Sequence, residues 1–170
     1  LKNGMTLLFE KRDIPVVSVG IAVKNGGINE SADEKGISHF IEHLLYKGTP
    51  TRNAHQIAEE IEKNGGILNG FTDEIVTAYW CKMPGKHLNV ALEVLSDMVK
   101  NPLFDEKEIE KERKVIFEEM KMYKDSPIRY VYDRIHNLLY EGPFSMDLIG
   151  TEKTLQNTNR KKLLNKFKQI

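Results

Sequence analysis

The sequence predicts an α+β domain of two layers, in which a mixed, mostly antiparallel sheet is covered by helices on one face. Two observations support this fold class. Segments with strand composition lie near the N-terminus and again before residue 85, and segments with helical periodicity follow each of these strand pairs. A two-layer arrangement lets both kinds of element bury their apolar sides against each other.

Four segments have the composition of strands. Residues 5–12 and 16–27 are rich in β-branched and aliphatic side chains, and we expect them to pair with each other. Residues 67–75 and 76–84 are joined at an acidic turn and are expected to form a hairpin closed by a Pro-Gly pair.

Six segments have the periodicity of helices. Residues 36–47 and 53–66 lie between the strand pairs, and the second of them ends in a Gly-Gly pair typical of a helix C-cap. Four more follow the hairpin, with prolines marking breaks among them: 88–100, 105–124, 129–140 and 154–170. A chain of 170 residues without repeats or linkers is expected to form one domain over residues 1–170.

Composition excludes several classes of partner and site. Basic and acidic residues number 25 each with no long run of like charge, so nucleic acid is not an expected partner. The single cysteine, Cys81, excludes an intrachain disulfide framework and multi-cysteine zinc sites, and a reducing, cytoplasmic compartment is favoured. No apolar run reaches the length of a membrane span, so none is expected.

The segment ISHFIEHLLYKGTP places two histidines four residues apart, with a glutamate directly before the second. At about 100° per residue, the side chains of His39, Glu42 and His43 share one sector of a helix. The opposite sector is apolar and consists of Ile37, Phe40, Ile41, Leu44 and Leu45. Two imidazoles and one further ligand suit a catalytic zinc site. The polar face of an ordinary amphipathic helix is the alternative, and this motif alone leaves both open.

A further ligand is sought in the helix predicted over 105–124. Its apolar arc is expected to contain Ile109, Val115, Ile116, Met120 and Tyr123. Glu112 and Glu119 fall inside this arc, whereas Glu118 falls on the polar side. An inward carboxylate needs a cation or a metal as partner. Zinc is one such partner, and an arginine or lysine such as Arg134, or a position at the rim, is the alternative.

The motif His39-Phe40-Ile41-Glu42-His43, with the distant Glu119, resembles the inverted-motif zinc peptidases of the pitrilysin, insulysin and mitochondrial-processing-peptidase group. Flanking segments such as GISHFIEHLLYKGT and ERKVIFEEMKMYKDSP extend the resemblance over essentially the whole chain. It implies that His39, His43 and Glu119 bind Zn²⁺. It also implies catalytic roles for two glutamates, with Glu42 as the general base and Glu112 as a supporting acidic residue.

The resemblance also implies an activity and a substrate. It implies a zinc-dependent metalloendopeptidase that cleaves peptides or presequences with a zinc-bound water activated by Glu42. An extended peptide substrate would pair with the strand segment Asn69, Gly70, Phe71 and Thr72, which is β-augmentation. The family usually has alanine where this chain has Gly70. The alternatives are a non-catalytic peptide-binding or scaffold subunit of the same fold, which typically loses motif residues, and a metal-binding protein without hydrolysis.

A partner is implied as well. Members of this group build the working enzyme from two related domains, on one chain or on two, so a second homologous domain or subunit is expected. Residues 1–170 would then be an N-terminal zinc-peptidase domain truncated before its last strand and helix, and poorly active alone. A homo-oligomer formed through the unpaired sheet edge is a further expectation.

Overall fold

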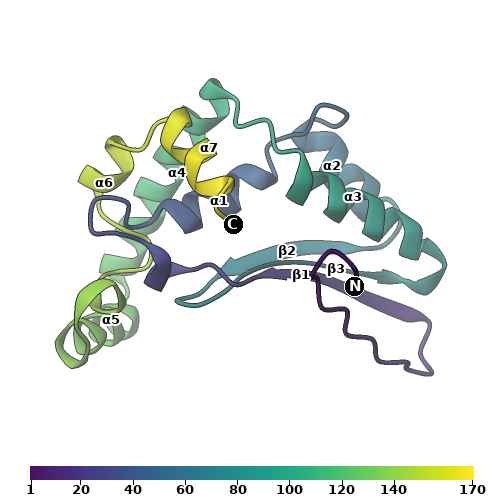
Figure 1. Ribbon diagram of the computed structural model, residues 1–170, viewed down its shortest axis with the longest axis horizontal. Helices are drawn as coiled ribbons and strands as arrows, with labels where there is room; N and C mark the ends of the chain where they lie inside the picture. Colours follow the sequence, from purple (N-terminus) through teal and green to yellow (C-terminus); the bar gives the residue numbers. More distant parts are fainter.

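Three strands and seven helices form two layers in the computed structural model, which describes residues 1–170. The strands are β1 (Val16–Val23), β2 (Ile67–Thr72) and β3 (Thr77–Pro84), and they are ordered β1-β3-β2. Both neighbouring pairs are antiparallel. Most of the helices gather on one face of this sheet, and α5 extends past its end (Figure 1). The predicted α+β class is therefore confirmed, with a sheet that is antiparallel throughout.

The helices agree with the predicted ones, with one exception. Their bounds are α1 (Ile37–Leu45), α2 (Ala54–Glu62), α3 (Leu88–Lys100), α4 (Glu106–Asp125), α5 (Pro127–Leu139), α6 (Glu152–Gln156) and α7 (Arg160–Phe167). The chain also has three short 3₁₀ turns, which are Gly27–Asn29 before α1, Gly85–His87 before α3 and Gly142–Ser145 after α5. The single helix predicted over 154–170 is wrong, because the Asn159 side chain accepts a hydrogen bond from the Lys162 amide and starts a separate helix there.

The strand predicted over residues 5–12 is also wrong. This segment has no regular secondary structure, and Leu7, Leu8 and Phe9 are 71%, 88% and 86% exposed. In Figure 1 it runs outside the two layers, at the lower right. A strand requires a partner for its backbone groups, and β1 pairs with β3 instead. Strand composition alone was therefore misleading here.

Helix α1 lies at the centre of the domain, where it contacts β2, β3, α4 and α7. Its apolar sector is buried as predicted, with Phe40 and Leu44 fully enclosed in the core. The remaining sector faces α4 and the end of β2. The core therefore fixes the orientation of α1, and with it the direction of the histidine motif.

The N-terminus of α1 is fixed by a buried carboxylate. Glu30 accepts hydrogen bonds from the backbone amides of Gly36 and Ser38, at 2.9 and 2.6 Å. A negative group at this end of a helix satisfies free amides and favours the helix dipole. Gly36 has a φ of 92°, and a Cβ there would lie 2.5 Å from the carbonyl oxygen of Ile149. Both features hold the first turn of α1 in place.

Candidate metal centre

Side chains from two helices converge beside the end of β2. His39, Glu42 and His43 of α1 offer ligand atoms that all lie within 4.8 Å of one another. From α4, Oε2 of Glu119 lies 3.7 Å from Nε2 of His39 and 3.6 Å from Nε2 of His43. The three side chains that the sequence suggested as metal ligands therefore meet at one point.

The donor set fits a zinc ion. Zinc in a tetrahedral site binds nitrogen and oxygen ligands at about 2.0–2.2 Å, which places neighbouring ligand atoms roughly 3.3 Å apart. The two distances from Glu119 to the histidines are slightly longer, and both Nε2 atoms lie near the same carboxylate oxygen. Burial, together with the neighbouring His43, lowers the pKa of His39 to about 4, so its ring is neutral at pH 7. A neutral imidazole is the form that binds a metal.

Glu112 contacts the Nδ1 side of the second histidine, His43. Its Oε2 lies 3.1 Å from Nδ1 of His43, and its Oε1 lies 2.6 Å from Nζ of Lys47. Burial opposes ionisation, but the hydrogen bonds to His43 and Lys47 outweigh it and lower the pKa of Glu112. An ionised acceptor at Nδ1 places the proton there and leaves Nε2 free for a metal.

Lys47 is a site residue that the sequence analysis missed. Glu112 was expected to point inward, and at 5% exposure it does so. The basic partner expected for an inward glutamate was Arg134, but its guanidinium lies over the ring of Tyr130, 5.9 Å from the centroid. Lys47 follows His43 at helical spacing, and this position was the available signal.

Glu42 lies beside the same point but is turned toward the sheet. It is 9% exposed, and burial raises the pKa of its carboxyl group. The hydroxyl of Thr72 donates to Oε2 of Glu42 at 3.5 Å. A residue of β2 therefore reaches the motif glutamate directly.

Strand β2 presents a free backbone edge. It pairs with β3 on one side only, and no backbone hydrogen bond joins its other edge. Gly70 and Thr72 are half-buried on the side of α1, whereas Asn69 and Phe71 are exposed. An open edge of this kind can pair with an extended peptide.

Helix α4 adds a second residue that the sequence analysis did not place in the site. The hydroxyl of Tyr123 donates to Oε1 of Glu119, and its ring lies 4.3 Å from the guanidinium of Arg129. Burial and the bond to Glu119 raise the pKa of Tyr123 to about 12. Tyr123 thus holds one oxygen of Glu119 while the other faces the histidines.

One expectation for α4 is wrong. Val115 was placed in the apolar arc but is 48% exposed, and Arg113 is buried instead. The guanidinium of Arg113 donates to the carbonyl oxygens of Leu155, in the last turn of α6, and of Thr158, in the connection from α6 to α7. Packing against α6, which the sequence did not predict as a separate helix, therefore rotates the buried face of α4 toward Arg113.

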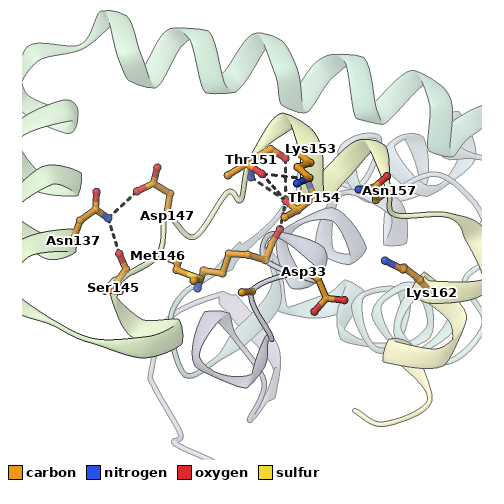
Figure 2. Close-up of a pocket in the computed structure, with 12 residues that line it drawn as sticks. Asp33, Asn137, Ser145, Met146, Asp147, Thr151, Lys153, Thr154, Asn157 and Lys162 are labelled. Atoms are coloured by element: carbon orange, nitrogen blue, oxygen red, sulfur yellow. Dashed lines mark hydrogen bonds between the residues drawn. The ribbon is translucent and has the colours of Figure 1, made fainter.

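A large polar cleft lies elsewhere. It measures about 910 Å³. Its lining is mostly polar and comes from residues 32–35 before α1, from α5 and from the segment that includes α6 and α7. Figure 2 shows that lining residues bond to one another: the Asn137 amide donates to the carbonyl oxygen of Ser145 and to the carboxylate of Asp147. A second cleft of about 720 Å³ is lined by Tyr123, Arg129 and the acidic turn after β2. Tyr123 connects this second cleft to the site through its bond to Glu119, but the two histidines line neither cleft, so cleft size does not locate the site.

Comparison with known proteins agrees with this geometry. The family model of insulinase (peptidase family M16) matches residues 6–152. The chain is 39% identical over 161 residues to the uncharacterized zinc protease YmxG of Bacillus subtilis, covering 93% of this chain and 39% of that protein. It is 32% identical over 170 residues to a probable mitochondrial-processing peptidase subunit beta of Arabidopsis thaliana, covering 99% of this chain and 32% of the relative.

Solved structures share the fold. A protease from Helicobacter pylori superimposes with a TM-score of 0.85 at 29% identity, over 91% of this chain and 38% of that one. An M16 domain from Pseudomonas fluorescens that is described as inactive has a TM-score of 0.84 at 15% identity, over 94% of this chain and 39% of that one. The chain spans about two fifths or less of the relatives' lengths.

Proposed function

Because this chain belongs to the insulinase family, peptidase family M16, we propose that it carries the zinc centre of a metalloendopeptidase that cleaves peptides or presequences. The observation that supports this most strongly is the convergence of His39 and His43 with Glu119, from two separate helices, beside a buried glutamate. Zinc proteases and a processing peptidase subunit are among the relatives of this chain.

In this proposal His39, His43 and Glu119 hold the zinc ion. When bound, zinc lowers the pKa of a water molecule and polarises a scissile carbonyl group. The bond from His43 to Glu112 supports the assignment, because it directs Nε2 toward the ion. Glu112 therefore acts through His43 and, in turn, depends on Lys47.

Glu42 is the proposed general base. Its carboxylate accepts a proton from the attacking water and later delivers it to the departing amine. Burial raises its pKa, which suits a group that must both take and return a proton. Its bond from Thr72 connects it to the strand on which the substrate would lie.

The free edge of β2 is the proposed substrate site. An extended peptide would pair with the backbone of Asn69, Gly70, Phe71 and Thr72, which fixes its direction relative to Glu42. Pairing of this kind recognises peptide shape more than sequence. The acidic turn after β2 and Arg129 line the adjoining cleft, where side chains of the peptide could be placed.

A second homologous domain or subunit is the proposed partner. The chain spans 39% of YmxG and 32% of the Arabidopsis subunit, so the relatives contain considerably more protein than this domain. A non-catalytic half of the same fold is the competing function. It is less well supported, because all four residues of the proposed zinc and base set are present and meet.

One experiment separates the peptidase from the binder. Glu42→Gln keeps the shape of the side chain and removes its ability to accept a proton, so the zinc content should stay near wild type. Peptide hydrolysis should fall by about 10²–10⁴-fold. Metal analysis and a peptide-cleavage assay on the intact protein measure both quantities. Near-normal turnover in this variant would refute the proposed mechanism.

A further inference from the structure

A buried tyrosine hydroxyl lies beside the proposed base without a hydrogen-bond partner. Tyr46 follows the last turn of α1, one turn beyond Glu42. Its ring packs on Tyr79, with centroids 6.0 Å apart, and its hydroxyl oxygen is enclosed and unpaired. Buried polar atoms in folded proteins nearly always have a partner, so an enclosed donor beside a catalytic group requires an explanation.

Gly70 creates the space for this hydroxyl. In the register of β2 and β3, Gly70 is paired with Tyr79, the residue on which Tyr46 packs. A Cβ at Gly70 would lie 2.4 Å from the Tyr46 hydroxyl, 2.8 Å from the carbonyl oxygen of Ala78 and 3.3 Å from Oε1 of Glu42. The backbone of Gly70 is ordinary strand, so glycine is needed here for room and not for an unusual conformation.

The space beside Gly70 therefore adjoins both a hydrogen-bond donor and an acceptor. The Tyr46 hydroxyl is a donor without an acceptor, and Oε1 of Glu42 is the carboxylate oxygen that Thr72 does not reach. Both atoms lie next to the space left by Gly70, so a rotation of either side chain into that space would bring the hydroxyl and Oε1 together. Their positions on successive turns of α1 already place them on the same face.

We propose that Tyr46 is a positioning residue for Glu42, and that Gly70 is the residue that permits it. This inference rests on the proposed function. The Tyr46 hydroxyl donates to Oε1 while the Thr72 hydroxyl donates to Oε2, so the carboxylate is held from both sides and its plane is fixed relative to the two histidines. Tyr46 acts through Glu42 and does not itself touch the substrate.

The first test removes the hydroxyl alone. In the intact, zinc-loaded protein, Tyr46→Phe should lower kcat about tenfold, because one charge-assisted hydrogen bond to the base is lost. KM should stay within about twofold, since the strand that holds the peptide is unchanged. Zinc content should also stay constant. Ser96→Ala, which removes a hydroxyl on α3 that bonds only to the Glu93 carbonyl oxygen, is the control and should leave kcat unchanged. An unchanged kcat in Tyr46→Phe would overturn the proposal.

The second test uses the contact with Gly70. Gly70→Ala should lower kcat and the midpoint of thermal unfolding, because the new methyl group displaces the hydroxyl. In the Tyr46→Phe background, Gly70→Ala should lower kcat and the unfolding midpoint by less than it does in the wild type. The clash with the carbonyl oxygen of Ala78 is present in both backgrounds and cancels in the double-mutant cycle. If the effects of Gly70→Ala and Tyr46→Phe on kcat and on the unfolding midpoint were additive, the proposed coupling of Tyr46 and Gly70 would be contradicted.

A structural readout separates this inference from the proposed function. Absence of peptide hydrolysis by the wild-type protein would count against the peptidase proposal. Crystal structures of the zinc-loaded wild type and of Tyr46→Phe would still report the position of the Glu42 carboxylate. We expect it to rotate or become less ordered when the hydroxyl is absent. A carboxylate that stays in place with equal order would show that Tyr46 does not position it.

Discussion

Nδ1 of His43 lies 3.1 Å from Oε2 of Glu112, so one ring nitrogen of this histidine is occupied by a carboxylate while the other faces Glu119. Lys47 holds the far oxygen of Glu112 at 2.6 Å, which keeps that carboxylate ionised and in place. The ring of His43 is thus oriented by two glutamates of α4, one of which is held by a lysine that follows α1. His39 has no such support, because its Nδ1 atom is buried without a partner.

This relationship predicts the effect of Glu112→Gln. The amide keeps the size of the side chain but loses the charge that favours a proton on Nδ1, so the affinity for zinc should fall about 10–100-fold. Competition with a chelator of known affinity measures the change. Glu118→Gln, whose side chain is 71% exposed on the same helix, is the control and should bind zinc as the wild type does. Equal affinities for zinc in the two variants would show that Glu112 does not support zinc binding.

Metal content tests the ligands themselves. Purified protein should contain about one zinc ion per chain, and the double variant His39→Ala/His43→Ala should contain almost none, because a single carboxylate cannot hold the ion. Elemental analysis after dialysis measures this ratio. His55→Ala removes an exposed histidine, with an 84% exposed side chain, and should leave the ratio unchanged. Full zinc occupancy in the double variant would place the ion elsewhere.

The stability of the domain should depend on pH through Asp97. Oδ2 of this residue accepts hydrogen bonds from Thr49, Thr51 and Arg52 at 2.7, 2.8 and 2.9 Å. Burial opposes its charge, but the bonds from Thr49 and its neighbours outweigh it and hold the pKa of Asp97 well below its usual value. A lowered pKa adds stability that is present above the unfolded value of about 4 and is lost as the pH falls toward the folded value.

Asp97→Asn tests this dependence. At pH 6 the variant should be less stable by about 1–3 kcal/mol, because charged hydrogen bonds are replaced by weaker ones. The difference should shrink below pH 4, where the wild type begins to lose the same interactions. Denaturant unfolding at several pH values measures both effects. Asp13→Asn, in the exposed N-terminal segment, should show no such trend. A stability difference that does not change with pH would contradict the assignment to Asp97.

Local pattern predicted most of the helices and indicated most residues of the candidate site, while the family resemblance implied their roles. The histidine motif needs only the 3.6-residue period to bring its side chains together, and Glu119 was recognisable as a carboxylate inside an apolar arc. Lys47 was missed because its partner, Glu112, lies on another helix. Tyr123 was interpreted as an apolar residue, and its bond to Glu119 depends on the orientation of the ring. These contacts arise from packing between helices, which periodicity does not describe.

Non-local contacts also explain the errors in the fold. Residues 5–12 have the composition of a strand, but whether a strand forms depends on an available neighbour. The prediction of one helix over 154–170 took no account of the cap at Asn159, which competes locally with helix continuation. The exposure of Val115 follows from the packing of α4 against α6, the helix that this error concealed.

The last prediction concerns the second domain or subunit. Two parts of the chain expose apolar side chains. Leu8 and Phe9 in the N-terminal segment are more than 80% exposed. Helix α5, which extends to the lower left in Figure 1, has no buried residue, and its Ile128 and Leu138 are 74% and 85% exposed. Exposed apolar surface of this kind is typical of an interface. None of the helices is both long and apolar enough to cross a membrane. We expect residues 1–170 alone to self-associate and to hydrolyse peptides poorly.

Addition of the homologous second domain or subunit should reverse both properties. Covering the apolar surface should reduce self-association, and groups from a second half that contact the substrate should raise the rate by orders of magnitude. Light scattering and a peptide-cleavage assay, each with and without the second half, measure the two effects. Leu138→Glu on α5 is the matched variant. It should weaken association with the second half while zinc content stays the same, since α5 contributes no metal ligand. Robust hydrolysis by residues 1–170 alone, at the rate of the reconstituted pair, would show that one domain suffices.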